Sequence, residues 1–165
     1  MNKELKQEII KEVLDYLNKE KTVYIEKISD DIVTPLYASE GDAGMDIRAS
    51  VDIVIKPHET KLVSTGIKIA IPTGYEIQIR PRSGMSLKTN LRIANSPATI
   101  DSGYRDELKI IVTNISMDED LIIKKNDRIA QMVLCKYETI SFKEVEDITF
   151  IEGNRGGGFG HSGIN

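Results

Sequence analysis

The sequence predicts an all-β protein with one helix added at its N-terminus and a glycine-rich arm at its C-terminus. Between residues 22 and 150, short runs of alternating apolar and polar residues follow one another, and turn-forming residues separate them. Strand patterns do not alternate with helix patterns, which argues against a doubly wound parallel sheet. The regular spacing of the runs favours a sandwich, a barrel or a jelly roll.

Length and charge limit the class of protein further. The 165 residues suit one domain with short appendages, and 40% apolar and 29% charged residues are ordinary for a globular chain. The formal net charge is −4. Sequence-independent binding of nucleic acid needs clustered positive charge, so we expect no nucleic-acid partner. A small anionic ligand remains open, because it needs only a local group of donors.

Residues 2–21 predict an amphipathic helix. Its apolar residues recur at helical spacing between lysines and glutamates: Leu5, Ile9, Ile10, Val13, Leu14 and Leu17. The apolar stripe needs a surface to cover it, either the protein's own core or a neighbouring subunit. The balance of acidic and basic residues argues against a membrane-binding helix.

The strands follow in order, and turns separate them. The runs are VDIVIK at 51–56, IKIAI at 67–71, YEIQIR at 75–80, LKIIVTN at 108–114 and IAQMVLCKY at 129–137. SEGDAG, KPHET and IPTGY mark turns. The single cysteine, Cys135, lies in the last run, where a buried structural thiol is expected.

No membrane partner is expected, because no segment approaches the about 20 apolar residues of a membrane span. The N-terminal residues are too polar for a signal peptide, so we expect a cytoplasmic protein. We place boundaries at 1–21 for the helix, 22–150 for the β domain and 151–165 for the arm. The arm concentrates glycine: six of the twelve glycines lie in residues 153–165.

RPRSGMS at residues 80–86 is a candidate anion site. Pro81 ends the strand pattern, and Arg82, Ser83 and Gly84 follow it. An arginine fork matches phosphate oxygens, a serine adds a hydroxyl, and a glycine lets backbone N–H groups approach an anion. From this stretch alone, an ordinary polar turn is the other interpretation.

A second candidate is the turn-rich segment 94–110. It combines a carboxylate, Asp101, with an aromatic ring, Tyr104, and several small polar residues. Asp101 is a candidate general base, because a carboxylate can orient and deprotonate a water molecule. A turn-capping aspartate is the alternative.

The remaining polar residues are interpreted on local grounds. Gln131, inside an apolar run, is a structural bridge or a ligand contact, and Asp127 and Arg128 could pair on the surface. Asp46, at the head of a strand, is a structural aspartate on local grounds. Asn126 suits a left-handed turn. The two histidines, His58 and His161, have no metal-ligand spacing and are expected to be solvated.

Taken in order, five of these stretches resemble the motif series of the trimeric deoxyuridine triphosphate nucleotidohydrolases (dUTPases). They are AGMDIRA at 43–49, RSGMS at 82–86, NSPATIDSGYRDE at 95–107, NDRIAQM at 126–132 and RGGGFGHSG at 155–163. The resemblance covers the chain from about residue 22 to its end and leaves out the N-terminal helix. It implies a jelly-roll-like β-clip subunit and a homotrimer whose three active sites are shared between subunits.

The resemblance also implies an activity, hydrolysis of dUTP to dUMP and pyrophosphate, with Mg²⁺ held mainly by the triphosphate. Asp101 matches the base that orients water for attack on the α-phosphorus. Tyr104 matches the ring that packs under the deoxyribose and leaves no room for a 2′-hydroxyl. The uracil slot would be lined by Asn95 and the backbone of Thr99, Ile100 and Asp101, with Lys109 near its end. A 5-methyl or a 4-amino group would fit poorly there.

The phosphate side carries over in the same way. Arg82, Ser83 and Gly84 match the phosphate-binding turn, and Gln131 matches the amide that reaches the α-phosphate. Asp46 matches a carboxylate linked to the metal through water or to neighbouring motifs; no direct metal ligand is expected. Positioning and charge stabilisation would supply most of the catalysis.

In this family the C-terminal arm is a lid, which explains an arginine and an aromatic ring in a glycine-rich segment. Phe159 would stack over the uracil and Arg155 would reach the γ-phosphate. Ser162 and backbone N–H groups such as that of Gly160 would close over the phosphates. Glycines would keep the arm mobile when the site is empty.

The chain departs from the family pattern at three places. Three residues separate Arg155 from Phe159, where the family usually has four. The third motif reads GYRDE instead of DYRGE, so Gly103 and Asp106 differ, and Asn126 replaces a glycine. Two alternatives therefore stand beside the hydrolase: a nucleotide-gated interaction partner that docks through the helix, and the related dCTP deaminase. The deaminase needs a glutamate-centred proton relay whose motif the sequence lacks.

Overall fold

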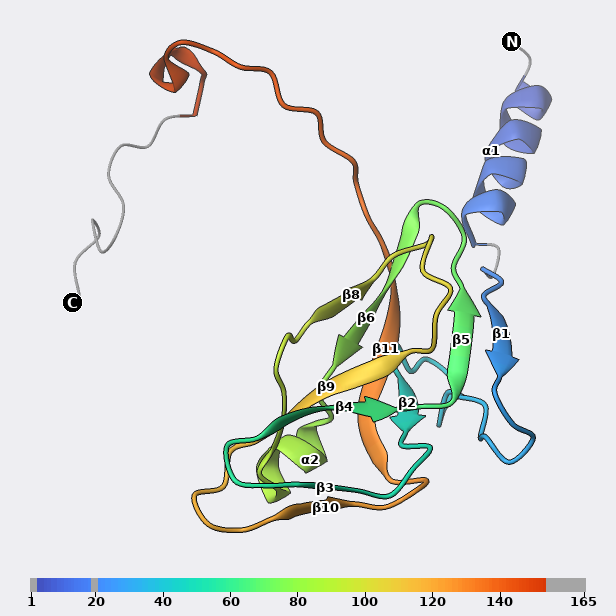
Figure 1. The fold of residues 1–165 in the computed structure, drawn as a ribbon. Coiled ribbons are helices and arrows are strands. Elements are labelled where there is room, and N and C mark those ends of the chain that lie inside the picture. The colour runs from blue at the N-terminus through green and yellow to red at the C-terminus, as the bar shows by residue number, and fades with distance from the viewer. Residues whose placement is uncertain (1–2, 19–20, 154–165) are drawn as a thin grey trace.

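The computed structural model describes residues 3–18 and 21–153, and it has eleven strands, two α-helices and one 3₁₀ turn there (Figure 1). The elements are α1 (Lys3–Asn18), β1 (Tyr24–Lys27), β2 (Met45–Arg48), β3 (Ile53–Ile55), β4 (Thr60–Ser64), β5 (Ile67–Ala70), β6 (Tyr75–Arg80), α2 (Ser83–Lys88), β7 (Leu91–Ile93), β8 (Ala98–Ile100), β9 (Lys109–Asn114), β10 (Leu121–Ile123), β11 (Arg128–Lys136) and η1 (Ile148–Phe150). The all-β class and the N-terminal helix are confirmed. Each of the five alternating runs contains a strand.

The described strands form small antiparallel sheets. The largest has the order β2-β11-β6-β8, and a three-stranded sheet has the order β4-β9-β7. Two further pairs, β1-β5 and β10-β3, complete the subunit. Because β11 pairs with both β2 and β6, segments far apart in the sequence meet along this one strand.

Alternation along the strands builds the core. On β6, Ile77 and Ile79 are each 1% exposed, whereas Glu76, Gln78 and Arg80 between them lie half-buried on the other face. Burying one such isoleucine side chain contributes about 1.5–3 kcal/mol to folding. The period-two pattern in YEIQIR therefore decides which face of the sheet turns inward.

A buried amide joins three segments at one end of the core. Asn114 is fully buried, and its side chain donates to the carbonyl oxygens of Ile55 at 2.9 Å and Glu119 at 2.8 Å. Its Oδ1 accepts from the Ser116 N–H at 2.9 Å. A buried amide with all these partners specifies one arrangement of the chain, since an unpaired one would cost stability.

The turn before β11 is held by carboxylates. Asn126 has φ 72°, which confirms the left-handed conformation expected there, and Asp127 Oδ2 accepts from the Lys124 N–H at 2.8 Å. Asp31 pairs with the Lys125 ammonium, whose hydrogen bond lowers the pKa of Asp31 to about 2. Asp52 accepts from the Lys125 N–H at 2.7 Å, which also lowers the pKa of Asp52. The expected surface pair of Asp127 with Arg128 is wrong, because Asp127 is used as a turn cap and Arg128 turns to Asp46.

Both ends of the described chain lie outside the β body (Figure 1). The α1 side chains that the structure describes keep their apolar stripe exposed: Leu5, Ile9, Ile10 and Val13. No described helix has the length and apolarity needed to cross a membrane. After β11 the chain runs outward to η1, and Phe142 and Phe150 on this segment are 92% and 85% exposed. The expectation that Cys135 is buried is wrong: the residue is half-buried, and its Sγ accepts from Arg80 Nη2 at 3.6 Å.

Candidate active site

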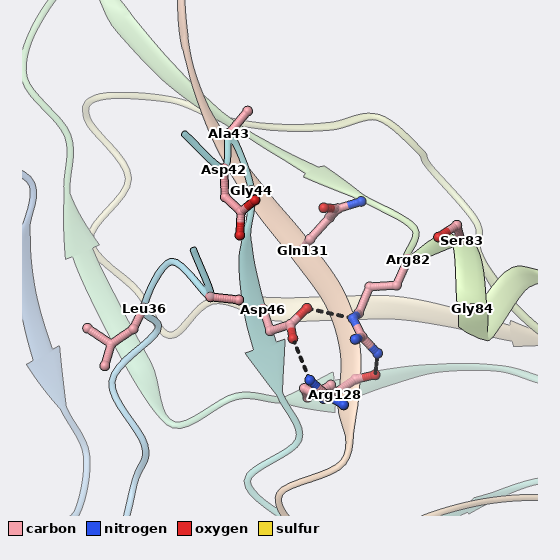
Figure 2. A pocket seen from close by; sticks show the side chains of 11 residues that line it. Leu36, Asp42, Ala43, Gly44, Asp46, Arg82, Ser83, Gly84, Arg128 and Gln131 are labelled. Atoms are coloured by element: carbon pink, nitrogen blue, oxygen red, sulfur yellow. Dashed lines mark hydrogen bonds and ion pairs between the residues drawn. The ribbon is translucent and has the colours of Figure 1, made fainter. Parts of the chain in front are cut away.

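A polar pocket of about 470 Å³ lies where β2, β11 and the start of α2 meet (Figure 2). Its lining includes five of the residues expected on the phosphate side: Asp46, Arg82, Ser83, Gly84 and Gln131. The loop before β2 contributes Leu36, Ala38, Asp42, Ala43 and Gly44. Arg128, which the sequence reading did not place in a site, lines the pocket as well.

Asp46 links two arginines at the floor of this pocket. Its Oδ1 accepts from Arg82 Nε at 2.5 Å, and its Oδ2 accepts from Arg128 Nη1 at 3.2 Å. Arg82 Nη1 also donates to the Arg128 carbonyl oxygen at 3.3 Å. One carboxylate thus holds two positive groups side by side and leaves them with donors for an anion.

A β-bulge explains why Arg128 and Gln131 line the same pocket. On a regular strand, residues three apart point to opposite faces. The register between β11 and β2 shifts between Arg128 and Ala130, and the consecutive residues Ile129 and Ala130 are both fully buried. The extra residue turns Arg128 to the side on which Gln131 lies. The signal in the sequence was two adjacent apolar residues between two polar ones.

Gln131 serves as the structural bridge and as a pocket residue together. Its Nε2 donates to the Pro81 carbonyl oxygen at 2.9 Å, which ties β11 to the end of β6. Gly44 lies directly against it: a Cβ at residue 44 would come within 2.5 Å of Gln131 Oε1. The glycine therefore leaves the space that the amide occupies.

The expected turn at residues 82–84 is the beginning of a helix, which corrects the sequence prediction. Pro81 ends β6, and Arg82 takes an extended N-cap conformation with φ −88° and ψ 133°. The Ser86 N–H donates to the Arg82 carbonyl oxygen at 3.0 Å, which closes the first turn. Ser83 and Gly84 are exposed in this first turn, where N–H groups have no partner in the helix itself.

The residues expected around the base and sugar gather in a second pocket. It encloses about 200 Å³ between β8 and β9, and its lining includes Asn95, Thr99, Ile100, Tyr104 and Lys109. Apolar residues from β4, β6 and β7 complete the lining. The Tyr104 N–H donates to the Asp101 carbonyl oxygen at 3.1 Å, which folds the loop after β8. Asp101 itself is exposed at the start of this loop and lines neither pocket.

The two pockets share no lining residue. The residues expected on the phosphate side thus line one pocket, and most of those expected around the base and sugar line another pocket of the same chain. The remaining expected site residues, Arg155, Phe159, Gly160 and Ser162, lie outside the described residues.

The first pocket has donors for an anion and few oxygen ligands for a metal ion that arrives without a phosphate. Within residues 3–18 and 21–153, no group of three or more His, Cys, Asp or Glu side chains is placed to hold one. Both oxygens of Asp46 face arginines. Mg²⁺ commonly takes only one or two carboxylates and completes its shell with water and phosphate oxygens. The donor set therefore fits Mg²⁺ that arrives bound to a polyphosphate.

Comparison with known proteins matches one family throughout. A family model described as dUTPase matches residues 30–163. The deoxyuridine 5′-triphosphate nucleotidohydrolase of Fusobacterium nucleatum is 48% identical over 146 residues, which cover 87% of this chain and 99% of that relative. The enzyme of the same name from Finegoldia magna is 53% identical over 131 residues, or 78% of this chain and 90% of the relative.

Solved structures give the same result for the fold. The dUTPase of Staphylococcus bacteriophage 80alpha with dUpNHpp superposes with a TM-score of 0.77 at 28% identity, covering 87% of this chain and 99% of that one. A dUTPase from phage phi11 of S. aureus, described with a structural Mg(II) ion, superposes with a TM-score of 0.70 at 27% identity. It covers 77% of this chain and 98% of its own. These likenesses confirm the expected subunit fold.

Proposed function

The chain belongs to the dUTPase family, and from this membership we propose that it hydrolyses dUTP to dUMP and pyrophosphate. Such an enzyme keeps uracil out of DNA and supplies dUMP for thymidylate synthesis. A free deoxynucleotide drawn on by DNA synthesis is a cytoplasmic substrate, so we place the reaction there. The relatives' shared name gives the reaction class. We assign the contacts to the substrate to the two pockets.

The observation that carries the proposal is the pair of guanidinium groups held by Asp46. A triphosphate is a flexible polyanion, and two fixed arginines match it in charge and in donor geometry. We assign Arg82, Ser83, Gly84 and Arg128 to the phosphate chain. Gln131, three residues after Arg128 on β11, is assigned to the α-phosphate. Donors fixed before substrate binds stabilise charge that develops on the leaving pyrophosphate.

We propose the homotrimer with shared sites that the resemblance to the dUTPase motifs implies. One nucleotide has its base and its phosphates in one molecule, and no residue lines both pockets, which supports a site whose two groups of residues come from two subunits. Apolar exposure supports this assembly: Leu62 beside the second pocket is 58% exposed, and Phe142 on the outward segment is 92% exposed. A neighbouring subunit would cover both side chains.

In the second pocket we assign uracil to the slot lined by Asn95, Thr99 and Ile100, and the deoxyribose to the ring of Tyr104. Asp101, next to this slot, acts as the general base. It takes a proton from water as the water attacks the α-phosphorus, and the P–O bond to the departing pyrophosphate breaks on the opposite side. Asp101 is exposed in the single chain, which supports a position facing the phosphate pocket of a neighbouring subunit.

Mg²⁺ bound to the triphosphate would neutralise part of the phosphate charge. Asp46 is the carboxylate of the pocket floor, and an outer-sphere link through water is the role we assign to it toward the metal. Its direct contacts are the two arginines.

The glycine-rich arm, with Arg155, Phe159, Gly160 and Ser162, is proposed as the lid of a neighbouring site. A chain ending at residue 154 should fold normally and turn dUTP over at least tenfold more slowly, because a lid excludes water and completes the phosphate contacts. Circular dichroism and a pyrophosphate-release assay measure the two effects. Unchanged turnover would remove the lid role.

The proposal is tested by incubating the purified chain with dUTP and Mg²⁺ and identifying products by chromatography. dCTP, dTTP and UTP are run beside it. We expect dUMP and pyrophosphate from dUTP alone, because a slot built for uracil and deoxyribose selects base and sugar together. Deamination of dCTP, or hydrolysis of all four nucleotides, would overturn it.

A second function is favoured by α1, which lies outside the residues that match the family and exposes an apolar stripe. The 80alpha phage dUTPase is described as controlling transfer of virulence genes by a G protein-like mechanism. A nucleotide-gated partner interaction of this chain would use α1 as its docking element. We expect a partner to be recovered in pull-downs with the full chain and dUpNHpp, and to be lost when residues 1–21 are removed. Equal recovery with both chains contradicts it.

A further inference from the structure

The loop that carries Asp101 and Tyr104 is closed by Glu107. The Tyr104 hydroxyl donates to the Glu107 carbonyl oxygen at 2.8 Å. The Tyr104 N–H donates to the Asp101 carbonyl oxygen at 3.1 Å. The phenol ring is thus held at both its ends, by the turn that follows β8 and by the peptide group of residue 107. Where Glu107 lies decides where the ring lies.

The Glu107 side chain fastens this peptide to a different part of the fold. Its Oε1 accepts from the Gly66 N–H at 3.0 Å, and its Oε2 lies 3.5 Å from the Lys109 ammonium. The side chain is only 19% exposed. A carboxylate that is this well covered and accepts a backbone N–H is a strong, directional anchor.

The anchor point itself is rigid. Gly66 has φ 73°, and a Cβ there would lie 2.5 Å from Ile32 Cδ1, so the backbone sits directly against the core. The Leu108 N–H donates to the Ile67 carbonyl oxygen at 2.8 Å, and the Thr65 hydroxyl donates to the Leu108 carbonyl oxygen. Thr65 and Leu108 are 3% and 1% exposed. The connection between β4 and β5 is therefore a fixed base for the loop.

We propose that Glu107 is a positioning residue for sugar selection, because its carboxylate anchors the Tyr104 loop to Gly66. The inference rests on the proposed function, in which the Tyr104 ring packs under the deoxyribose. A ring that cannot retreat leaves no space for a 2′-hydroxyl. Glu107 touches neither substrate nor water in this scheme and acts only through the ring's position.

Loss of the Glu107 anchor should change the selection between dUTP and UTP more than the overall rate of hydrolysis. Without the anchor, the loop can move the Tyr104 ring away from the sugar, which opens space for the 2′-hydroxyl of a ribose. Hydrolysis of UTP should then rise relative to hydrolysis of dUTP, because displacements of about 1 Å in a site change rates by up to about 100-fold. A merely structural glutamate would lower both activities in the same proportion.

The experiment measures kcat/KM for dUTP and UTP in the full chain with Mg²⁺. In Glu107→Ala we expect the dUTP-to-UTP ratio to fall about 10- to 100-fold. Glu107→Gln keeps an oxygen that can accept from the Gly66 N–H, so it should retain the ratio. Tyr104→Phe removes the hydroxyl that meets the Glu107 carbonyl and should lower the ratio. The double variant should be no worse than the more affected single one, since the two act on one contact chain.

Glu59→Ala is the matched control. Glu59 also accepts a backbone N–H, that of Lys56 at 2.8 Å, and pairs with a lysine, Lys61 at 3.0 Å, in a turn between β3 and β4. Its loss should lower Tm and leave the dUTP-to-UTP ratio unchanged.

An unchanged dUTP-to-UTP ratio in Glu107→Ala, with dUTP still hydrolysed, overturns the assignment of Glu107 and leaves the proposed function standing. If Glu107→Ala does not fold, the test rests on Glu107→Gln. A lowered dUTP-to-UTP ratio in folded Glu107→Gln overturns the anchor role. An unchanged ratio in Glu107→Gln, together with a lowered ratio in Tyr104→Phe, supports it. No turnover of dUTP by the unaltered chain overturns the proposed function and this inference with it.

Discussion

A methyl group added at residue 44 would meet Gln131 Oε1 at 2.5 Å, which makes Gly44→Ala a sensitive probe of the pocket that we propose for the phosphates. The amide is the far end of a flexible side chain, so it can move aside without unfolding the protein. We expect stability to change by less than about 1 kcal/mol. The displaced amide loses its hydrogen bond to Pro81, and kcat for dUTP should fall about 10- to 100-fold.

Thermal melting and steady-state kinetics measure these two effects. Gln131→Ala is the reference, because an alanine there has no amide to displace. Adding Gly44→Ala to it should reduce kcat no further. A further large loss in the double variant would show that Gly44 matters for another reason.

Asp101→Asn tests the general base. The amide keeps the size of the carboxylate and cannot accept a proton, so kcat should fall about 10²- to 10⁴-fold. Binding should be kept, because the slot's other residues are untouched. Titration with dUpNHpp checks the affinity, and a stopped assay of dUMP checks the rate. Full activity would end the assignment of Asp101.

At the scale of elements, β11 shows what a sequence pattern can and cannot predict. Alternation in YEIQIR and IKIAI predicted β6 and β5, because one face of each strand is buried and the other is not. The bulge at Arg128 was not predicted, because it depends on how β11 pairs with β2. On β2, Asp46 lies 82 positions before Arg128 in the sequence. For the same reason, the sequence showed neither the pairing of Arg128 with Asp46 nor the hydrogen bond between Glu107 and Gly66, which lie 41 positions apart.

The turn before β11 predicts a dependence of stability on pH. The pKa of Asp31 lies at about 2, below its ordinary value of 3.8, because Lys125 and Ser29 donate to the folded carboxylate. A lowered pKa means that the folded state favours the ionised form. This contribution is therefore present above pH 3.8 and lost as pH falls toward 2.

Tm measured from pH 5 to pH 2 checks the direction. We expect the decrease in Tm over this range to be smaller in Asp31→Asn, which has no carboxylate to protonate. Asp31→Asn should also be less stable than the parent at pH 5. Identical profiles for the two proteins would show that the pair contributes nothing measurable, as many exposed pairs do.

At the scale of the whole molecule, the two pockets of one chain predict that inactive subunits can repair each other. Asp101→Asn damages the base and sugar pocket's neighbourhood, and Gln131→Ala damages the phosphate pocket. In a site shared between subunits, a mixed trimer can combine an intact half from each. Random mixing of equal amounts should recover about a quarter of the unaltered activity.

The assay compares each variant alone with a mixture that has been unfolded together and refolded. Two differently tagged copies of Asp101→Asn, treated in the same way, are the control. Activity that stays at the level of the separate variants would show that each site is built within one chain.

The order of five short motifs predicted the family, which the comparisons confirm, and the all-β class followed from alternation alone. Of the expected site residues that the structure describes, all but Asp101 line one of two pockets, and no residue lines both. Residue types are readable in a sequence. How one subunit faces another is a property of surfaces that no local pattern encodes.

The carboxylate shared by two arginines has a consequence for how this protein can evolve. Losing Arg82 or Arg128 leaves Asp46 with one positive partner, whereas losing Asp46 leaves two positive groups facing each other without a counter-charge. Mutational paths through this surface should therefore be ordered, with tolerated changes at Asp46 appearing mainly after an arginine has been replaced. We therefore expect Asp46, Arg82 and Arg128 to covary among natural sequences.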